Sequence, residues 1–186
     1  MAKVLVFIDN PGETLKKSSL ELLTIARSLG EPAVAFNGEL HDGVASTLGA
    51  YGVQALYRPS AADLDDYLVG PKASYLAAAV QTAGAGIVLA ENTADGREVA
   101  ARLGIKLGAG VITDVVGVDP DGTAHKSVLA GSYMTTAKAT TPGGRAHGKG
   151  QHHHAGAGRH RHGAAVHHRR GAGDGHRRIG QDHCTQ

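Results

Sequence analysis

The sequence predicts an α/β fold: a doubly wound, mostly parallel sheet with helices on both faces, followed by a strand pair and a disordered tail. Short valine-rich apolar runs alternate five times with stretches whose apolar residues recur at helical spacing. The runs contain few polar residues, which is typical of strands buried on both faces of a sheet. Such alternation indicates a parallel sheet, because each parallel connection needs a crossover that a helix can supply.

Five apolar runs predict the strands of this sheet, at residues 3–9, 32–38, 53–59, 86–92 and 111–119. Most are bounded by glycine or proline, which interrupt regular structure. The first run, KVLVFID, is apolar until it ends at Asp9. Ligands of such sheets usually bind beyond the carboxyl ends of the strands, so the residues that follow each run are the first place to look for a site.

Helices are predicted between these strands, at residues 14–29, 41–52, 61–69, 71–84 and 95–110. The first has a stripe of leucines and ends before Gly30, and the fourth has Pro71 in its first turn. The last carries Val99, Ala100 and Leu103 on one stripe before a glycine stop. After Asp119 the pattern changes. A turn at PDGT precedes two alternating segments with no helix between them, which predict a hairpin or edge pair.

The chain divides at Pro142 in charge and in hydrophobicity. Residues 1–142 carry 11 lysines and arginines against 15 acidic residues, a net charge of −4, whereas residues 143–186 carry 8 against 2, a net charge of +6. The later segment holds ten of the twelve histidines, and its only large aliphatic residues are Val166 and Ile179. It cannot bury enough apolar surface to offset its ordering entropy, so residues 143–186 are predicted to be a disordered tail after a domain of residues 1–142.

The cysteine content bears on the cellular compartment. The only cysteine, Cys184, lies in the tail, so residues 1–142 have no disulfide framework and no thiol catalyst. A reducing cytoplasm is therefore the expected location. No apolar run approaches the roughly 20 residues of a membrane-spanning helix, and MAKVLVFIDN lacks the pattern of a secretory signal. We expect no membrane insertion.

Two loops at the expected ligand-binding edge are candidate sites. The loop DNPGET after the first strand has neither the G-x-G-x-x-G nor the Walker phosphate motif. The loop ENTADGRE after the fourth strand begins a helix, with Asp95 as the expected N-cap and Glu98 in a capping-box position. The N–H groups there could hold a phosphate or carboxylate, although every capped helix has such groups. The candidate nucleotide-binding residues are Thr93, Asp95, Gly96 and Arg97.

Residues 1–142 show no catalytic constellation. Their two histidines, His41 and His125, are too isolated to be metal ligands. The adjacent carboxylates Asp65 and Asp66 are typical of a solvated helix face rather than of an acid–base pair. We therefore predict no catalytic residue and no metal ligand.

Three stretches carry a family resemblance. TADGREVAARLGIKLGAGVITDV (93–115) and SVLAGSYMTTAKATTP (127–142) resemble the N-terminal domain of the electron transfer flavoprotein alpha subunit. Residues 1–36 resemble the start of the same subunit in its bacterial form. The resemblance ends near Pro142 and implies a Rossmann-like, nucleotide-binding-like domain.

The resemblance implies an electron carrier rather than an enzyme. Members of the family are heterodimers of an alpha and a beta subunit with one FAD, and they pass electrons from acyl-CoA dehydrogenases and related flavoenzymes to a membrane quinone oxidoreductase. The alpha N-terminal domain mainly provides surface against beta. In beta, a similar domain binds AMP through the loop that matches Thr93–Glu98, a place that is usually empty in alpha.

One departure from the family is large. The family holds FAD in a C-terminal domain of alpha whose glycine-rich motifs do not occur in this sequence. No FAD-contacting residue can be carried over. The sequence is therefore interpreted as a truncated alpha subunit, which alone is expected to bind no FAD and to be inactive.

The tail begins where the resemblance ends, and its residues admit a second reading. A frame moved forward by one nucleotide from Gly143 permits Val-Ala-Val-Leu-Thr-Val-Lys-x-Asn-Thr-Thr, a strand and a polar linker that resemble the family's continuation. The codons of His147, Lys149 and Gln151 restrict this reading to Thr/Met, Lys/Arg and Asn/Ser, and each agrees. We interpret the tail as the product of a frameshift near codon 143.

Two other functions stay open. A stand-alone nucleotide-binding module would use the helix start at Thr93–Arg97. A metal-binding protein would use the tail, whose three successive histidines can bind nickel or zinc through imidazole nitrogen. The basic side chains of the tail can also attract phosphate backbones. The tail has no aromatic residue to stack bases, however, and no nucleic-acid partner is predicted.

Overall fold

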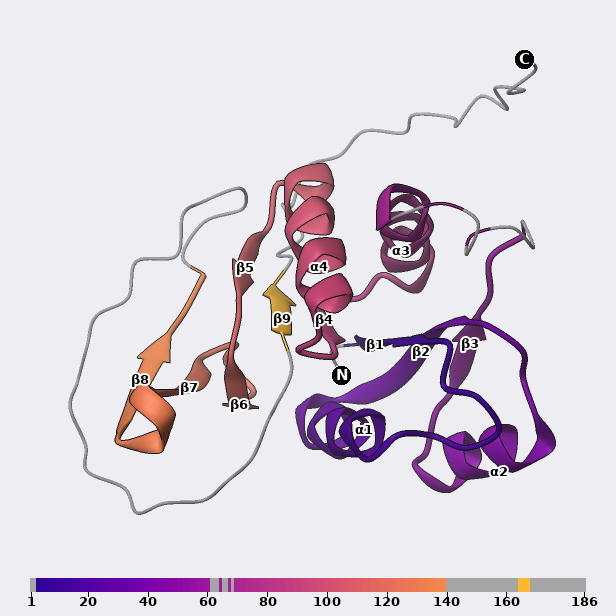
Figure 1. Cartoon of the computed structure of the whole chain (residues 1–186), viewed down its shortest axis with the longest axis horizontal. Coiled ribbons are helices and arrows are strands. Elements are labelled where there is room, and N and C mark those ends of the chain that lie inside the picture. Colours follow the sequence, from indigo (N-terminus) through magenta and orange to yellow (C-terminus); the bar gives the residue numbers. More distant parts are fainter. Residues whose placement is uncertain (1–2, 61–63, 65–66, 68, 140–163, 168–186) are drawn as a thin grey trace.

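The computed structural model describes residues 3–60, 64, 67, 69–139 and 164–167. These residues form two β-sheets, and α-helices cover both faces of the larger one (Figure 1). The larger sheet has the strand order β3-β2-β1-β4-β9-β5. In that order the strands are Ala55–Tyr57, Glu31–Asn37, Lys3–Asp9, Ile87–Ala90, Ala164–His167 and Gly110–Ile112.

Four neighbouring strands of this sheet are parallel, with β1 between β2 and β4, and β3 outside β2. Helices α1 and α2 cover one face and α3 and α4 cover the other. Their bounds are Lys17–Leu29, Asp42–Ala50, Val69–Ala83 and Ala94–Leu107. The predicted doubly wound α/β fold is confirmed. Of the helix predicted at 61–69, only residues 64, 67 and 69 are described, and the last of these begins α3.

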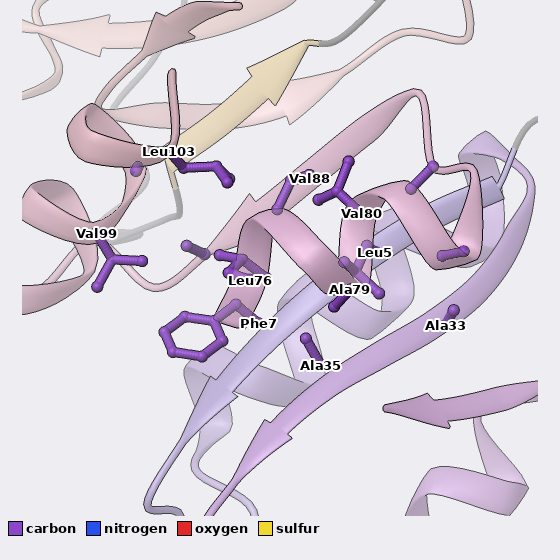
Figure 2. Packing of buried hydrophobic residues seen from close by; sticks show 14 of the residues in the cluster. Leu5, Phe7, Ala33, Ala35, Leu76, Ala79, Val80, Val88, Val99 and Leu103 are labelled. Atoms are coloured by element: carbon purple, nitrogen blue, oxygen red, sulfur yellow. The ribbon is translucent and has the colours of Figure 1, made fainter. Parts of the chain in front are cut away.

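Strand β1 contributes to the core on both faces. Its side chains alternate, so that Leu5 and Phe7 face the layer of α3 and α4 (Figure 2). Val4, Val6 and Ile8 join the second cluster, with α1 and α2. Each of these five side chains is at most 3% exposed. The uninterrupted apolar run at the start of the sequence therefore follows from the central position of β1.

The prediction of a single strand at 111–119 is wrong. Its first part is β5, and its second part is β6 (Val115–Val118), which belongs to the smaller sheet. The backbone turns at Asp114, whose φ of 57° lies in the left-handed region that non-glycine residues rarely adopt. Asn92 and Thr113 donate hydrogen bonds to its carboxylate at 3.0 and 3.1 Å. The Asn92 bond in particular lowers the pKa of Asp114 below its ordinary value.

The smaller sheet contains the predicted strand pair. Its order is β6-β7-β8, with β7 at Ala124–Val128 and β8 at Tyr133–Ala137, and both pairings are antiparallel. A short 3₁₀ turn at Leu129–Gly131 separates β7 from β8. Val115 and Ala124 pack into the core cluster of α1 and α2. The hairpin is therefore attached to the same core as the parallel sheet.

One part of the tail contradicts the prediction of disorder. Residues 164–167 form β9, which lies between β4 and β5 and is antiparallel to both (Figure 1). The backbone groups of β4 and β5 need hydrogen-bond partners along this gap, and β9 provides them. Composition could not show this, because the pairing uses backbone groups that every non-proline residue has. The other residues of the tail lie outside the described residues.

Tyr75 ties the edge strand β3 to helix α3. Its hydroxyl donates a hydrogen bond to the Tyr57 carbonyl at 2.8 Å and lies 3.3 Å from the Phe36 carbonyl. Burial raises the pKa of Tyr75 well above its ordinary value, so the phenol stays a protonated donor. Since β3 is only three residues long, this side chain is an important support for the edge of the sheet.

We predict that Tyr75→Phe lowers the free energy of unfolding by about 1 kcal/mol, because it removes the hydroxyl donor from a partly buried carbonyl. Tyr67→Phe is the matched control, since the Tyr67 side chain is 59% exposed. Denaturant unfolding followed by circular dichroism measures both variants. Equal stability of the two variants would show that β3 does not depend on this bond.

Candidate functional site

A pocket of about 290 Å³ lies at the carboxyl ends of β1 and β4. The strand order reverses between these two strands, and doubly wound sheets usually bind their ligands at such a point. The pocket is lined by residues from the ends of both strands and the starts of the neighbouring helices: Phe7, Asp9, Asn10, Lys16, Lys72, Glu91, Thr93, Asp95 and Gly96. Three of the four predicted nucleotide-binding residues are among them. The fourth, Arg97, is exposed and does not line the pocket.

Helix α4 begins differently from the prediction. Thr93, rather than Asp95, is the N-cap, and its hydroxyl accepts a hydrogen bond from the Gly96 amide at 3.0 Å. The third helical residue is therefore glycine, so no carboxylate is available there for a capping box. Glu98 instead forms an ion pair with Arg102 one turn later. Asp95 lies in the first turn, where its negative charge is favourable near the helix N-terminus.

Gly96 is required by packing. It is buried, and a Cβ atom at this position would overlap the carbonyl oxygen of Glu91 at the end of β4. The glycine thus allows the first turn of α4 to approach the strand closely. The sequence predicted Gly96 as a nucleotide-binding residue, but packing alone is sufficient to explain this glycine.

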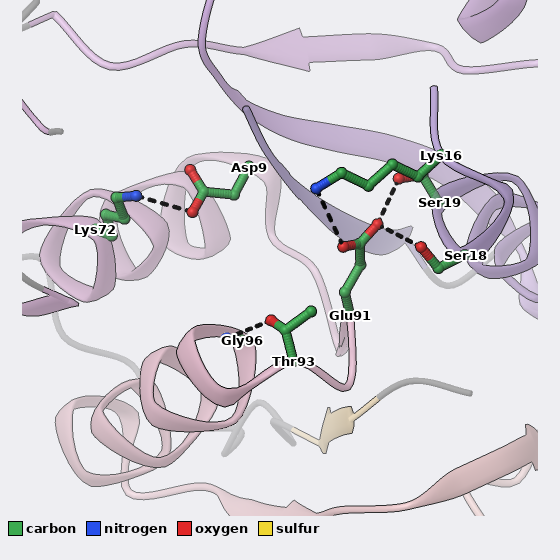
Figure 3. A network of polar contacts seen from close by, with 8 residues as sticks. All are labelled: Asp9, Lys16, Ser18, Ser19, Lys72, Glu91, Thr93 and Gly96. Atoms are coloured by element: carbon green, nitrogen blue, oxygen red, sulfur yellow. Dashed lines mark hydrogen bonds and ion pairs between the residues drawn. The ribbon is translucent and has the colours of Figure 1, made fainter. Parts of the chain in front are cut away.

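Glu91 connects the end of β4 with the start of α1. Its Oε1 accepts hydrogen bonds from the hydroxyls of Ser18 and Ser19, at 2.8 and 2.7 Å (Figure 3). Lys16 lies on the other carboxylate oxygen at 4.0 Å. The Glu91 side chain is only 13% exposed, so these three partners compensate much of its loss of hydration. Three groups at the start of α1 thus hold the Glu91 carboxylate at the edge of the pocket.

Asp9 has a similar set of partners at the end of β1. Lys72 of α3 donates to its Oδ2 at 2.8 Å (Figure 3). Asn37 at the end of β2 donates to its Oδ1 at 2.8 Å. The Lys72 and Asp9 side chains are 13% and 25% exposed. Removing one partner of a charge pair this far buried is costly, because the other charge is left buried and unpaired. Together the ion pair and the Asn37 hydrogen bond join β1, β2 and α3 around one carboxylate.

The electrostatics of the pocket disfavour a phosphate group. Three carboxylates line it, from Asp9, Glu91 and Asp95, against two lysines that already pair with the first two. A phosphate at the start of α4 would gain from the helix dipole but would meet the Asp95 carboxylate.

FAD, which the family resemblance implies, does not fit this pocket. The volume of about 290 Å³ is at the lower end of the usual range for small-molecule sites. A pyrophosphate would also have to displace carboxylates from the lysines it needs. This pocket therefore supplies no FAD site.

Sequence reasoning located the α4 start but missed the polar network around it. The partners of Glu91 and Asp9 come from other elements, and only the folded sheet brings them together. The available signal was that each carboxylate directly follows an apolar strand, which places it at the ligand-binding edge. Nothing in the spacing of Lys72 indicated that it would reach this edge.

The part of the chain that the structure describes has neither a cluster of metal-ligating side chains nor a membrane-spanning helix. Over residues 3–60, 64, 67, 69–139 and 164–167, no three histidine, cysteine or acidic side chains are grouped so that they could hold a metal ion. The same ranges contain no helix of sufficient length and apolar character to cross a membrane. The proposed metal-binding histidines of the tail are not covered by this finding.

The fold and the pocket define a nucleotide-binding-like α/β domain with a polar site where the strand order reverses. A family model described as the electron transfer flavoprotein domain matches residues 4–143. The electron transfer flavoprotein subunit alpha of Mycobacterium tuberculosis (strain CDC 1551 / Oshkosh) is 37% identical to this chain over 145 residues. That of Mycobacterium leprae (strain TN) is 35% identical over the same length. The chain belongs to the electron transfer flavoprotein alpha subunit family, as its sequence predicted.

These relatives are longer than the chain. The two mycobacterial alignments cover 75% of this chain and 44% of each relative, so the chain spans less than half of their length. The electron transfer flavoprotein subunit alpha of Syntrophomonas wolfei subsp. wolfei (strain DSM 2245B / Goettingen) is 26% identical over 138 residues, again 44% of its length. The family is one of electron carriers rather than of enzymes in the ordinary sense.

We predict that Gly96→Ala destabilises the domain by roughly 1–3 kcal/mol, the usual cost of overpacking, because the new methyl group overlaps the Glu91 carbonyl. Gly43→Ala is the matched control in the first turn of α2, where the nearest atom to a new Cβ, the Glu13 carbonyl oxygen, is 3.9 Å away. Alanine there should be neutral or stabilising by about 0.5–1 kcal/mol. Thermal unfolding measures both. If Gly96→Ala were as stable as the parent chain, packing would not explain this glycine.

Proposed function

We propose that residues 1–142 are the N-terminal domain of an electron transfer flavoprotein alpha subunit, and that this domain supplies a surface for a beta subunit rather than a site for the flavin. The observation that carries this proposal is the match of the family model to residues 4–143. The ion pairs of the pocket support it, because Asp9 and Glu91 already hold the lysines that a cofactor phosphate would need.

In the intact heterodimer, electrons would come from acyl-CoA dehydrogenases and related flavoenzymes and leave to a quinone oxidoreductase, with FAD as the carrier. The part of an alpha subunit described here takes no direct part in that transfer. Its contribution is structural, and the chain alone carries no FAD and no electron transfer activity. A cytoplasmic location belongs to the same proposal, in agreement with the absence of cysteine from residues 1–142.

We also propose that the alpha-type domain ends near Pro142 and that a frameshift near codon 143 produces the residues beyond it. The family match ends at residue 143, where net charge and histidine content change abruptly. Reading the coding DNA tests this proposal. An early stop in the neighbouring frame, or a neighbouring frame without FAD-domain motifs, would refute it.

A second candidate is a nucleotide-binding module that acts alone. Thr93, Asp95 and Gly96 line a pocket at the place where doubly wound sheets bind nucleotides, which favours this function. The three carboxylates of the pocket oppose it, because they repel phosphate. AMP is the ligand whose binding would distinguish the two candidate functions, since it is small enough to need only the start of α4.

We predict that the chain, co-expressed with a beta subunit of the same family, co-purifies with it but shows no visible flavin absorbance. Calorimetry of the isolated chain with AMP and ATP should give no heat at millimolar ligand. The Gly43→Ala variant serves as a folded control for both measurements.

Bound flavin in the complex would contradict the structural role. Failure to co-purify would refute the proposal that this domain has a beta-binding surface. Heat with AMP that disappears on adding a carboxylate by Thr93→Asp would instead support the nucleotide-binding module.

A further inference from the structure

We draw no further inference here: the strongest candidate, the exposed apolar surface of Leu129 and Tyr133 at the turn between β7 and β8 of the smaller sheet, carries none, because nothing in the structure shows what covers it.

Discussion

The burial of β1 on both faces is the constraint on which the rest of the structure depends. Five successive side chains from Val4 to Ile8 are almost completely inaccessible to water, so the strand needs a neighbour on each edge and a helical layer on each face. Its next residue, Asp9, emerges from this core as a carboxylate that has lost much of its hydration. The ion pair with Lys72 and the hydrogen bond from Asn37 compensate for that loss. The core and the polar site are thus consecutive parts of one strand.

The same constraint explains why a nucleotide-binding-like fold can have a pocket whose polar groups pair with one another rather than with a ligand. Every parallel strand that ends at this edge delivers polar groups there, and they need partners whether or not a ligand is present. Here Glu91 accepts hydrogen bonds from Ser18 and Ser19 and pairs with Lys16. Asp9 pairs with Lys72 and accepts a hydrogen bond from Asn37. These side chains connect α1 and α3 to the strands and are therefore not available to hold a phosphate. The network therefore fixes α1 and α3 against the sheet, which agrees with the structural role proposed for the domain.

Local sequence patterns were sufficient to predict much of this fold, but they were insufficient to predict the polar network of its site. The apolar run of β1 and the stripe of Val99 and Leu103 on α4 each reflect a periodicity that the core imposes. The break at Asp114 left no such trace, because a left-handed residue inside an apolar run changes direction without changing hydrophobicity. The N-cap was misplaced because Thr93 and Asp95 are both good caps, and the choice depends on where the close approach of Gly96 to Glu91 allows the helix to begin. The pairing of Lys72 with Asp9 joins residues 63 positions apart, beyond the reach of any local pattern.

Strand β9 links the integrity of the larger sheet to that of the smaller one. β5 has β9 as its hydrogen-bonded neighbour and leads directly through Asp114 into β6, so loss of β9 would also weaken the attachment of the segment that carries the hairpin. The hairpin would then be held mainly by Val115 and Ala124 in the core cluster of α1 and α2. Two exposed edges, on β4 and β5, would face each other across an apolar gap, an arrangement that promotes pairing between chains. The four residues of β9 therefore matter more for the behaviour of this chain than their number suggests, because they complete the larger sheet between β4 and β5.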